Sequence, residues 1–258
     1  MYYAQVLKVS RALMWLAGIL VAILGVIIAA SAATGLYAMP LPSGCGTPIA
    51  ALLAVASFSA AIFGSRFACT LSSENESHLA VAWTKPVSRA RYVLSIMAVD
   101  AAGMTIAFAM TMAAMLAFIG SLRALSCITL PSDTIAQLAR FLAFPLANYA
   151  LLVAATASVG KGGRTIIGFA WVGSIVVAAL GGAGLPHPWN QIFSTINLIN
   201  PLWYAAFAYA NASGDNVEVL VAGPHVQTLA LTTDVLALVA LLVAGVAVGI
   251  WQWKRVEA

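Results

Sequence analysis

The densest group of chemically active side chains in this protein lies in one short stretch, ENESHLAVAWTKPVSRARY, residues 74–92. It carries two carboxylates, a histidine and three basic groups: Glu74, Glu76, His78, Lys85, Arg89 and Arg91. Their spacing matches no metal-binding or catalytic motif such as H-E-x-x-H. Charged groups around an apolar Leu79 and Trp83 are typical of a docking surface, where an aromatic anchor supplies affinity and rim charges fix the register. The stretch therefore predicts recognition of a partner.

Other candidates for chemistry are few. The three cysteines, Cys45, Cys69 and Cys127, have no C-x-x-C spacing, and the three histidines are scattered. The segment SVGKGGRT, residues 158–165, has glycines and a lysine but not the spacing of the phosphate-binding loop G-x-x-x-x-G-K-[ST]. We interpret it as a tight turn. The sequence thus predicts no catalytic residue, no metal site and no cofactor bound by this chain, and a membrane enzyme is the weakest alternative.

Composition sets the environment in which this stretch must act. Of the 258 residues, 62% are hydrophobic and 8% are charged, whereas a soluble domain is about 45–50% apolar and about 25% charged. The net charge of +4 is modest and no basic stripe is interleaved with aromatic platforms, which excludes nucleic acid as a partner. The composition predicts an integral protein of the lipid bilayer.

Six apolar runs approach or exceed the roughly 20 residues that a helix needs to cross a membrane. We predict one all-α transmembrane domain over residues 1–258, with residues 1–11 as an interfacial segment. The predicted spans are residues 12–33, 48–65, 92–120, 138–159, 165–185 and 229–251. Pro145 predicts a kink in the fourth. The first run is longer than the core of a signal peptide, so we interpret it as a span.

Basic residues predict the orientation. With six spans and a cytoplasmic N-terminus, ten of the twelve Lys and Arg residues face the cytoplasm. These are Lys8, Arg11, Arg66, Lys85, Arg89, Arg91, Lys161, Arg164, Lys254 and Arg255. Only Arg123 and Arg140 fall at the outer side. The bias predicts a multi-pass protein of the cell (inner or plasma) membrane with both termini in the cytoplasm.

Residues 192–211 are nearly long enough to form a seventh span. Asn197, Asn200 and Pro201 interrupt their middle, and proline removes a backbone donor that a spanning helix needs. A seventh span would also weaken the charge bias. We therefore predict a re-entrant hairpin within a long outer loop, residues 186–228, before the last span.

The polar stretch then falls in a cytoplasmic loop, residues 66–91, between the second and third spans. Ser73 and Glu76 fit a capping box that opens a short helix, which stops before Pro86. Ser88 is predicted to cap a second helix that continues into the third span. The first helix would lie along the membrane surface as a docking element.

The arrangement resembles type-2 ABC exporter permeases. The resemblance is carried by Glu74 and Glu76, an apolar stretch from Leu79 to Trp83, and Lys85-Pro86-Val87-Ser88-Arg89 followed by Arg91 and Tyr92. The Gly-Lys that usually follows in that family is replaced by SIMAVD, residues 95–100. Six spans, cytoplasmic termini and a re-entrant segment extend the resemblance across nearly the whole chain.

The resemblance implies several partners. The short helix would be a coupling helix that docks a dimer of a separate ABC ATPase subunit, which would bind ATP and Mg. Residues 74, 76, 79, 83, 86, 89, 91 and 92 would form the contact. A second permease copy, identical or different, would complete the pathway. The sparse charge within the spans favours a hydrophobic or amphipathic cargo.

An ion-gradient-driven secondary transporter is the alternative. Asp100 lies within the third span, Asp234 near the outer end of the sixth, and Asn148 and Tyr149 in the fourth, and polar groups inside a membrane are candidate sites by default. Secondary transporters more often show paired ionisable groups and repeated halves, and the sequence indicates neither. Asn148 and Tyr149 are equally suited to bonding a neighbouring helix.

Two further expectations concern helix packing and the outer loops. Glycines of the fifth span, at 168, 173, 181, 182 and 184, are predicted to serve ordinary packing. Cys45 and Cys127 both fall on the outer side, where they could form a disulfide, while Cys69 stays reduced inside.

Overall fold

The computed structural model describes residues 2–33, 47–77, 88–121, 124–125, 128–130, 134–159, 161–183, 185–205 and 231–255. This part of the chain is helical, apart from one pair of two-residue strands, and six of its helices are long and apolar enough to cross a membrane. They are α1 (Tyr2–Ala33), α2 (Ile49–Ser65), α5 (Arg89–Ser121), α6 (Thr134–Thr156), α7 (Gly163–Gly182) and α11 (Leu231–Arg255). The prediction of an all-helical multi-pass membrane protein is confirmed, and each predicted span overlaps one of these helices.

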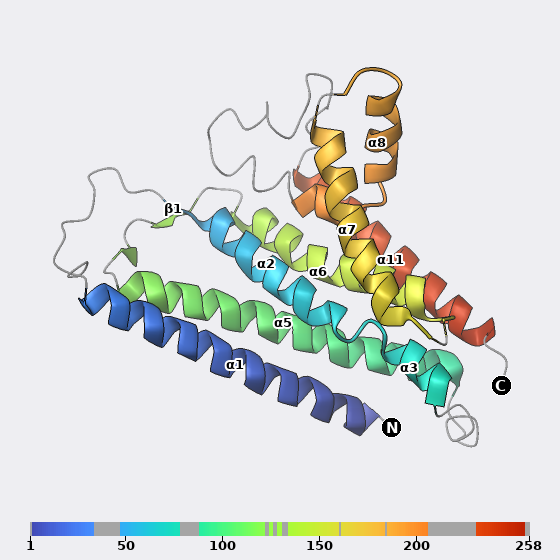
Figure 1. Cartoon of the computed structure of the whole chain (residues 1–258), viewed down its shortest axis with the longest axis horizontal. Coiled ribbons are helices and arrows are strands. Elements are labelled where there is room, and N and C mark those ends of the chain that lie inside the picture. The colour runs from blue at the N-terminus through green and yellow to red at the C-terminus, as the bar shows by residue number, and fades with distance from the viewer. Residues whose placement is uncertain are drawn as a thin grey trace.

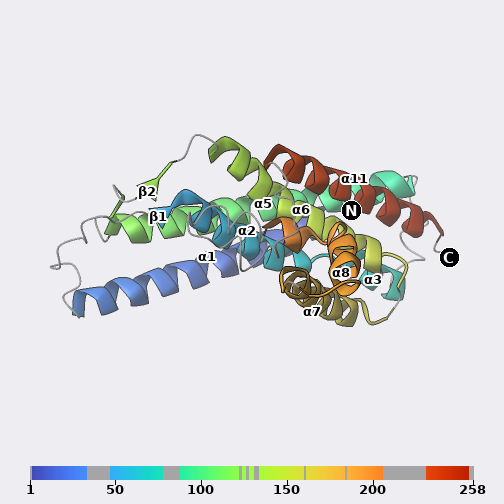
Figure 2. The same cartoon turned by 90° about the horizontal axis from the view of Figure 1, so that it is seen from above.

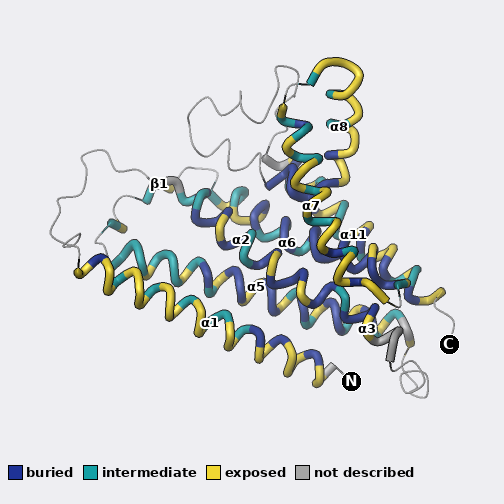
Figure 3. Tube along the Cα trace, viewed as in Figure 1, coloured by how far each residue is buried: buried dark blue, intermediate teal, exposed yellow. Residues whose placement is uncertain are grey.

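Helices α1, α2, α5, α6 and α11 run roughly along one axis, and α7 rises from them at an angle (Figure 1). Helix α1 lies along the outer side of α5, and its surface is largely exposed (Figure 3). Helices α2 and α6 are the most buried of the six, and their buried residues include Leu53, Phe141 and Phe144. Seen from above, α7 lies across the bundle from α11 (Figure 2).

Both described ends of the chain lie at the same end of this bundle (Figure 1). The ring of Tyr92, at the start of α5, stacks on Trp253 near the end of α11, with 6.2 Å between ring centroids. Most basic residues gather there, and we call this the basic end: Lys8, Arg11, Arg66, Arg91, Lys161, Arg164, Lys254 and Arg255. The side of a membrane that it faces stays a prediction.

Pro145 lies inside α6 without ending it. A proline has no N–H to donate to the carbonyl four residues earlier, here that of Phe141. The Ser57 hydroxyl of α2 donates to that carbonyl instead. An unpaired carbonyl is costly in hydrocarbon. The hydroxyl from α2 therefore supplies the hydrogen bond that the proline takes away from α6.

Helices α6 and α11 pack closely at two glycines of α11. A Cβ at Gly245 would lie 2.7 Å from the carbonyl carbon of Ala150, and one at Gly249 would lie 3.3 Å from Val153. In the fifth span, by contrast, Gly168 and Gly173 have nothing within 4 Å. Gly181 of the fifth span is closely packed, because a Cβ there would meet the side chain of Asn197. Close glycine packing also occurs in the last span, at a G-V-A-V-G spacing that our sequence interpretation overlooked.

The opposite end of the bundle holds a buried ion pair. Arg140 of α6 pairs with Asp234 in the first turn of α11, and its Nη2 donates to the carbonyl of Tyr204 at 2.7 Å. Arg140 is only 1% exposed. The sequence indicated no paired ionisable groups, and this was wrong: the partners lie in different spans, and only their packing brings them together.

Beyond α7, the short helix α8 (Trp189–Asn197) packs back against α7, and the chain is helical again from Pro201 to 205 (Figure 1). The predicted break at Asn197, Asn200 and Pro201 is confirmed, whereas re-entry into a membrane stays a prediction. Two amides hold the break against α7, because Asn197 Nδ2 donates to the carbonyl of Val177 and Asn200 Nδ2 donates to that of Ser174. Residues 206–228 of the predicted loop lie outside the described residues.

The remaining elements are short. β1 (Thr47–Pro48) pairs in parallel with β2 (Ile128–Thr129). This pairing joins the chain before α2 to the chain after α5.

Helix α3 (Thr70–Ser77) follows α2 after a turn at residues 66–69. With Ser73 as its N-cap the helix would begin at Glu74, but it begins four residues earlier, so the assignment of Ser73 as its N-cap was wrong. Ser73 lies inside the helix, and its hydroxyl donates to the carbonyl of Thr70.

Candidate functional site

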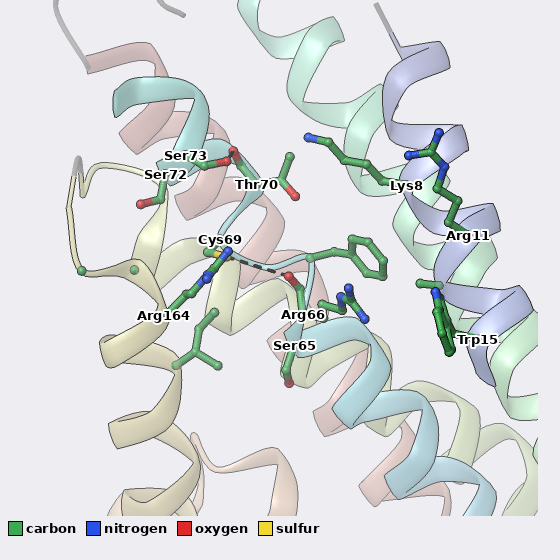
Figure 4. A pocket seen from close by; sticks show the side chains of 15 residues that line it. Lys8, Arg11, Trp15, Ser65, Arg66, Cys69, Thr70, Ser72, Ser73 and Arg164 are labelled. Atoms are coloured by element: carbon green, nitrogen blue, oxygen red, sulfur yellow. Dashed lines mark hydrogen bonds between the residues drawn. The ribbon is translucent and has the colours of Figure 1, made fainter. Parts of the chain in front are cut away.

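A pocket of about 950 Å³ opens at the basic end between α1, the α2–α3 turn and the start of α7 (Figure 4). Four basic side chains line it: Lys8, Arg11, Arg66 and Arg164. Lys8 extends toward Thr70 from α1, and Arg164 extends from α7 on the other side (Figure 4). We call this cavity the basic pocket.

Three local structures position these cations. Lys8, Arg11 and Trp15 share one face of α1, since residues three, four and seven apart stack along a helix. Arg66 lies in the turn after α2, which is closed by backbone bonds such as Phe67 N to Gly64 O at 2.9 Å. This turn buries Phe67 and leaves Arg66 exposed at the wall of the pocket.

Glycines determine how α7 begins at the pocket. Gly162 has a φ of 88°, a left-handed conformation that favours glycine, and no side chain caps the helix there. Gly163 packs closely on α3, because a Cβ at this position would lie 2.8 Å from Ser72 Oγ. Both glycines line the basic pocket. The uncapped N-terminus of α7 therefore adds the positive end of its dipole to the four cations.

The charge of the basic pocket is one-sided. None of the fifteen described residues lining it is acidic. Within the described part of the chain its four cations form no salt bridge, and the pair of Arg140 and Asp234 lies at the other end. Arg164 also lies in the first turn of a helix, where the dipole disfavours a cation. The arrangement can hold an anion.

A second hollow, of about 720 Å³, lies beside the basic pocket and is almost entirely apolar. Its walls come from α2, α7 and the helical residues after Pro201: Phe58, Ile62, Ser65, Trp171, Ile175, Ala178 and Leu202. We call it the apolar hollow. Ser65 lines both cavities, and its hydroxyl accepts a hydrogen bond from Trp171 Nε1 at 2.8 Å. The basic pocket and the apolar hollow therefore adjoin at Ser65.

A polar cluster is buried between α1, α5 and α6. Asp100 is fully buried and accepts two hydrogen bonds of 2.6 Å, one from Gln5 Nε2 and one from the Tyr149 hydroxyl. Gln5 also reaches Thr70 Oγ1 at 3.5 Å. The structure thus unites Asp100 and Tyr149, two predicted sites, and adds Gln5, which our sequence interpretation missed although it is a polar residue within α1.

Asn148, the third predicted polar site in the spans, does not join this cluster. It is buried, and its Nδ2 has no hydrogen-bond partner among the described residues. No three His, Cys, Asp or Glu side chains among the described residues lie together in a group that could hold a metal ion.

The predicted coupling interface is described only in part. Leu79, Trp83 and Pro86 lie outside the described residues. Glu74 and Glu76 lie in α3, where the structure describes their backbone and not their side chains. Ser88 caps α5, as predicted: its hydroxyl accepts the Arg91 N–H at 3.3 Å, and α5 begins at Arg89. Arg91 is exposed, whereas Tyr92 packs on Trp253.

The chain that leads into this loop is tied to the spans. Thr156 Oγ1 of α6 donates to the carbonyl of Ala68 at 2.8 Å, and Ser72 Oγ of α3 donates to that of Val159 at 2.6 Å. Together with the close contact at Gly163, these bonds join residues 68–72 to the end of α6 and the start of α7. A displacement of α3 would therefore also move the end of α6 and the start of α7.

Comparisons of this chain with protein-family models, with curated proteins and with solved structures find no match. Any assignment of function rests on the residues and contacts described above.

Proposed function

We propose that this protein is the membrane-spanning permease subunit of an ATP-driven ABC exporter. It would move a hydrophobic or amphipathic substrate, and a separate cytoplasmic ATPase dimer would hydrolyse ATP with Mg. The observation that carries the proposal is the linkage of α3 to the spans through Thr156, Ser72 and Gly163. A permease without an ATP site of its own needs a solid connection of this kind between its cytoplasmic loop and its helices.

The cavities support an amphipathic substrate class. The basic pocket accepts negative charge, the apolar hollow accepts hydrocarbon, and Ser65 borders both. Exposed apolar side chains on α1 and α7, such as Val21 at 70% and Phe169 at 74%, leave room for a second permease copy or for lipid. In this proposal the homodimer or heterodimer forms along these faces.

Substitution in residues 74–92 tests the ATPase partner. A buried aromatic anchor is worth about 2 kcal/mol or more, roughly thirtyfold in affinity. Trp83→Ala should therefore release the ATPase and uncouple ATP turnover from transport, and Glu76→Arg should do so more mildly. The measurements are co-purification of the ATPase and substrate-stimulated ATP turnover in reconstituted vesicles.

Trp251→Ala is the matched control. Trp251 also lies at the basic end and is 51% exposed, but it belongs to α11, where Arg255 stacks over its ring at 3.8 Å. This variant should keep the ATPase bound. If Trp83→Ala couples as well as Trp251→Ala, the docking role of the loop is refuted.

The buried Asp100 favours a second candidate, transport driven by an ion gradient. A fully buried carboxylate held by Gln5 and Tyr149 is the type of group that exchanges a proton or binds a cation within a membrane. In that case transport proceeds without an ATPase on an imposed gradient, and Asp100→Asn abolishes it. An ATPase requirement combined with an active Asp100→Asn variant would eliminate this candidate.

A further inference from the structure

We propose that the basic pocket and the apolar hollow together bind one anionic phospholipid. Its phosphate would lie among Lys8, Arg66 and Arg164, and one acyl chain would follow the apolar hollow along α2 and α7. This inference goes beyond the proposed function, because such a lipid can be bound whether it is cargo, regulator or structural component.

The charge of the basic pocket indicates the headgroup. Three separate segments deliver its cations, and no described lining residue is acidic. Lys and Arg suit phosphate oxygens by charge, and the N–H groups of a helix N-terminus point at an anion. Basic pockets between membrane-spanning helices are a recurrent binding place for anionic headgroups.

The position of the apolar hollow distinguishes a lipid from a soluble phosphate compound. The hollow begins at Ser65, where the basic pocket ends, and continues along Ile62 and Ile175. These two side chains are 65% and 53% exposed on helices that are apolar enough to span a membrane. An acyl chain would cover them, whereas a free phosphate would leave them uncovered. The juxtaposition therefore favours a ligand with both a charged head and a tail.

Trp171 places a specific contact at the junction. Its indole N–H donates to Ser65, whose own hydroxyl donates to the carbonyl of Ala61. This bond holds α7 beside α2 at the level where the headgroup would end and the hydrocarbon would begin. Tryptophan is enriched at that level of a bilayer because its ring is apolar and its N–H is polar.

Native mass spectrometry of the full chain in a neutral detergent tests the proposal with phosphatidylglycerol as the probe. Phosphatidylcholine is the comparison, because its choline cation would lie near the basic side chains. Inorganic phosphate, added at constant ionic strength, tests a soluble ligand. We expect phosphatidylglycerol to bind about tenfold tighter than phosphatidylcholine, and inorganic phosphate to displace it poorly.

Two variants from the same turn distinguish a specific binding site from nonspecific attraction by positive charge. Arg164→Gln removes a cation that lines the basic pocket, and Lys161→Gln removes an exposed cation three residues away that does not. Both side chains are exposed, so both variants should fold. Loss of one charge-assisted contact should weaken phosphatidylglycerol binding about tenfold in Arg164→Gln, and Lys161→Gln should bind like the unchanged chain. Equal weakening in both variants would overturn the site.

Ile62→Asn tests the tail. It should weaken phosphatidylglycerol binding and leave inorganic phosphate unaffected. If inorganic phosphate competes fully and Ile62→Asn has no effect, the pocket is a site for soluble phosphate and the lipid assignment is overturned. The measurement needs no ATPase, so failure here leaves the proposed function standing, and failure of ATPase coupling leaves this site standing.

Discussion

Arg140 is a buried cation with two partners from other parts of the chain. It is 1% exposed, pairs with Asp234 and donates to the carbonyl of Tyr204, and its Nε has no hydrogen-bond partner among the described residues. Removal of one member of a buried ion pair leaves a bare charge, whereas replacement of both members by apolar groups is often tolerated. We therefore expect the loss of Arg140 alone to destabilise the protein more than the loss of Arg140 and Asp234 together.

Arg140→Met should destabilise the protein by about 3–5 kcal/mol, because it strands the Asp234 carboxylate in a buried site. Adding Asp234→Leu should recover most of that loss. Thermal unfolding of the purified chain in detergent, taken through the full double-mutant cycle, measures the coupling. If the loss in the double variant equals the sum of the losses in Arg140→Met and Asp234→Leu, the two residues do not interact.

Much of this residue-level detail could not be predicted from the sequence. The positive-inside count placed Arg140 at the outer side, but a count does not say that Asp234 meets it. Likewise Asp100 and Tyr149 were recognised singly as polar residues in apolar runs, and their union with Gln5 depends on how three helices are rotated against one another. Side-chain partners from different spans are a property of packing, which no single run of sequence contains.

At the scale of elements, the sequence was a better guide. Hydrocarbon requires runs of about 20 apolar residues with satisfied backbones, so the six spans and the break at Asn197 to Pro201 could be predicted. The start of α3 could not, because the turn at residues 66–69 has no capping signature and Ser73 resembles a cap. The close packing at Gly245 was predictable in principle from its four-residue spacing to Gly249.

Gly245→Val tests that packing. The added side chain would overlap the backbone of Ala150, which cannot move aside as a flexible side chain could. We expect a loss of about 1–3 kcal/mol, typical of overpacking, seen as a lower unfolding temperature in detergent. Gly173→Val is the matched control, since nothing lies within 4 Å of a Cβ there. Comparable losses in the two variants would contradict close packing of α11 on α6.

The pairing of β1 with β2 bears on the predicted disulfide. Cys45 and Cys127 themselves lie outside the described residues, yet Thr47 pairs with Ile128 in the short ladder. A disulfide needs Cα atoms about 4.4–6.8 Å apart. We expect mass spectrometry of the non-reduced chain to find a peptide linking the two cysteines, with Cys69 alkylated as a free thiol. Detection of Cys45 and Cys127 in alkylated form would refute the bond.

For the whole molecule, the common location of the two chain ends is the feature with the widest consequence. Tyr92 on Trp253 places the start of α5 beside the end of α11, and most basic residues share that end. An even number of crossings follows if the bundle spans a membrane. The charge bias further predicts that this end is cytoplasmic.

Cysteine labelling tests this topology. A cysteine introduced near Asp215 should react with a membrane-impermeant reagent added outside intact cells, whereas one introduced at Ala258 should react only after lysis. The background for both is the chain with Cys45, Cys69 and Cys127 replaced by serine. Labelling of Ala258 in intact cells would overturn both the count of six spans and the orientation.

The Arg140–Asp234 pair also has a consequence for biosynthesis. Arg140 leaves the ribosome 94 residues before Asp234, so α6 must enter the bilayer while its arginine has no counter-ion. An arginine within a span costs about 2.5–3.5 kcal/mol during insertion. Helix α6 is therefore expected to remain near the insertion machinery, or to sit shallowly, until α11 emerges and neutralises it. Assembly of this protein would then depend on α11, and chains truncated before Leu231 should fail to hold α6 in its final position.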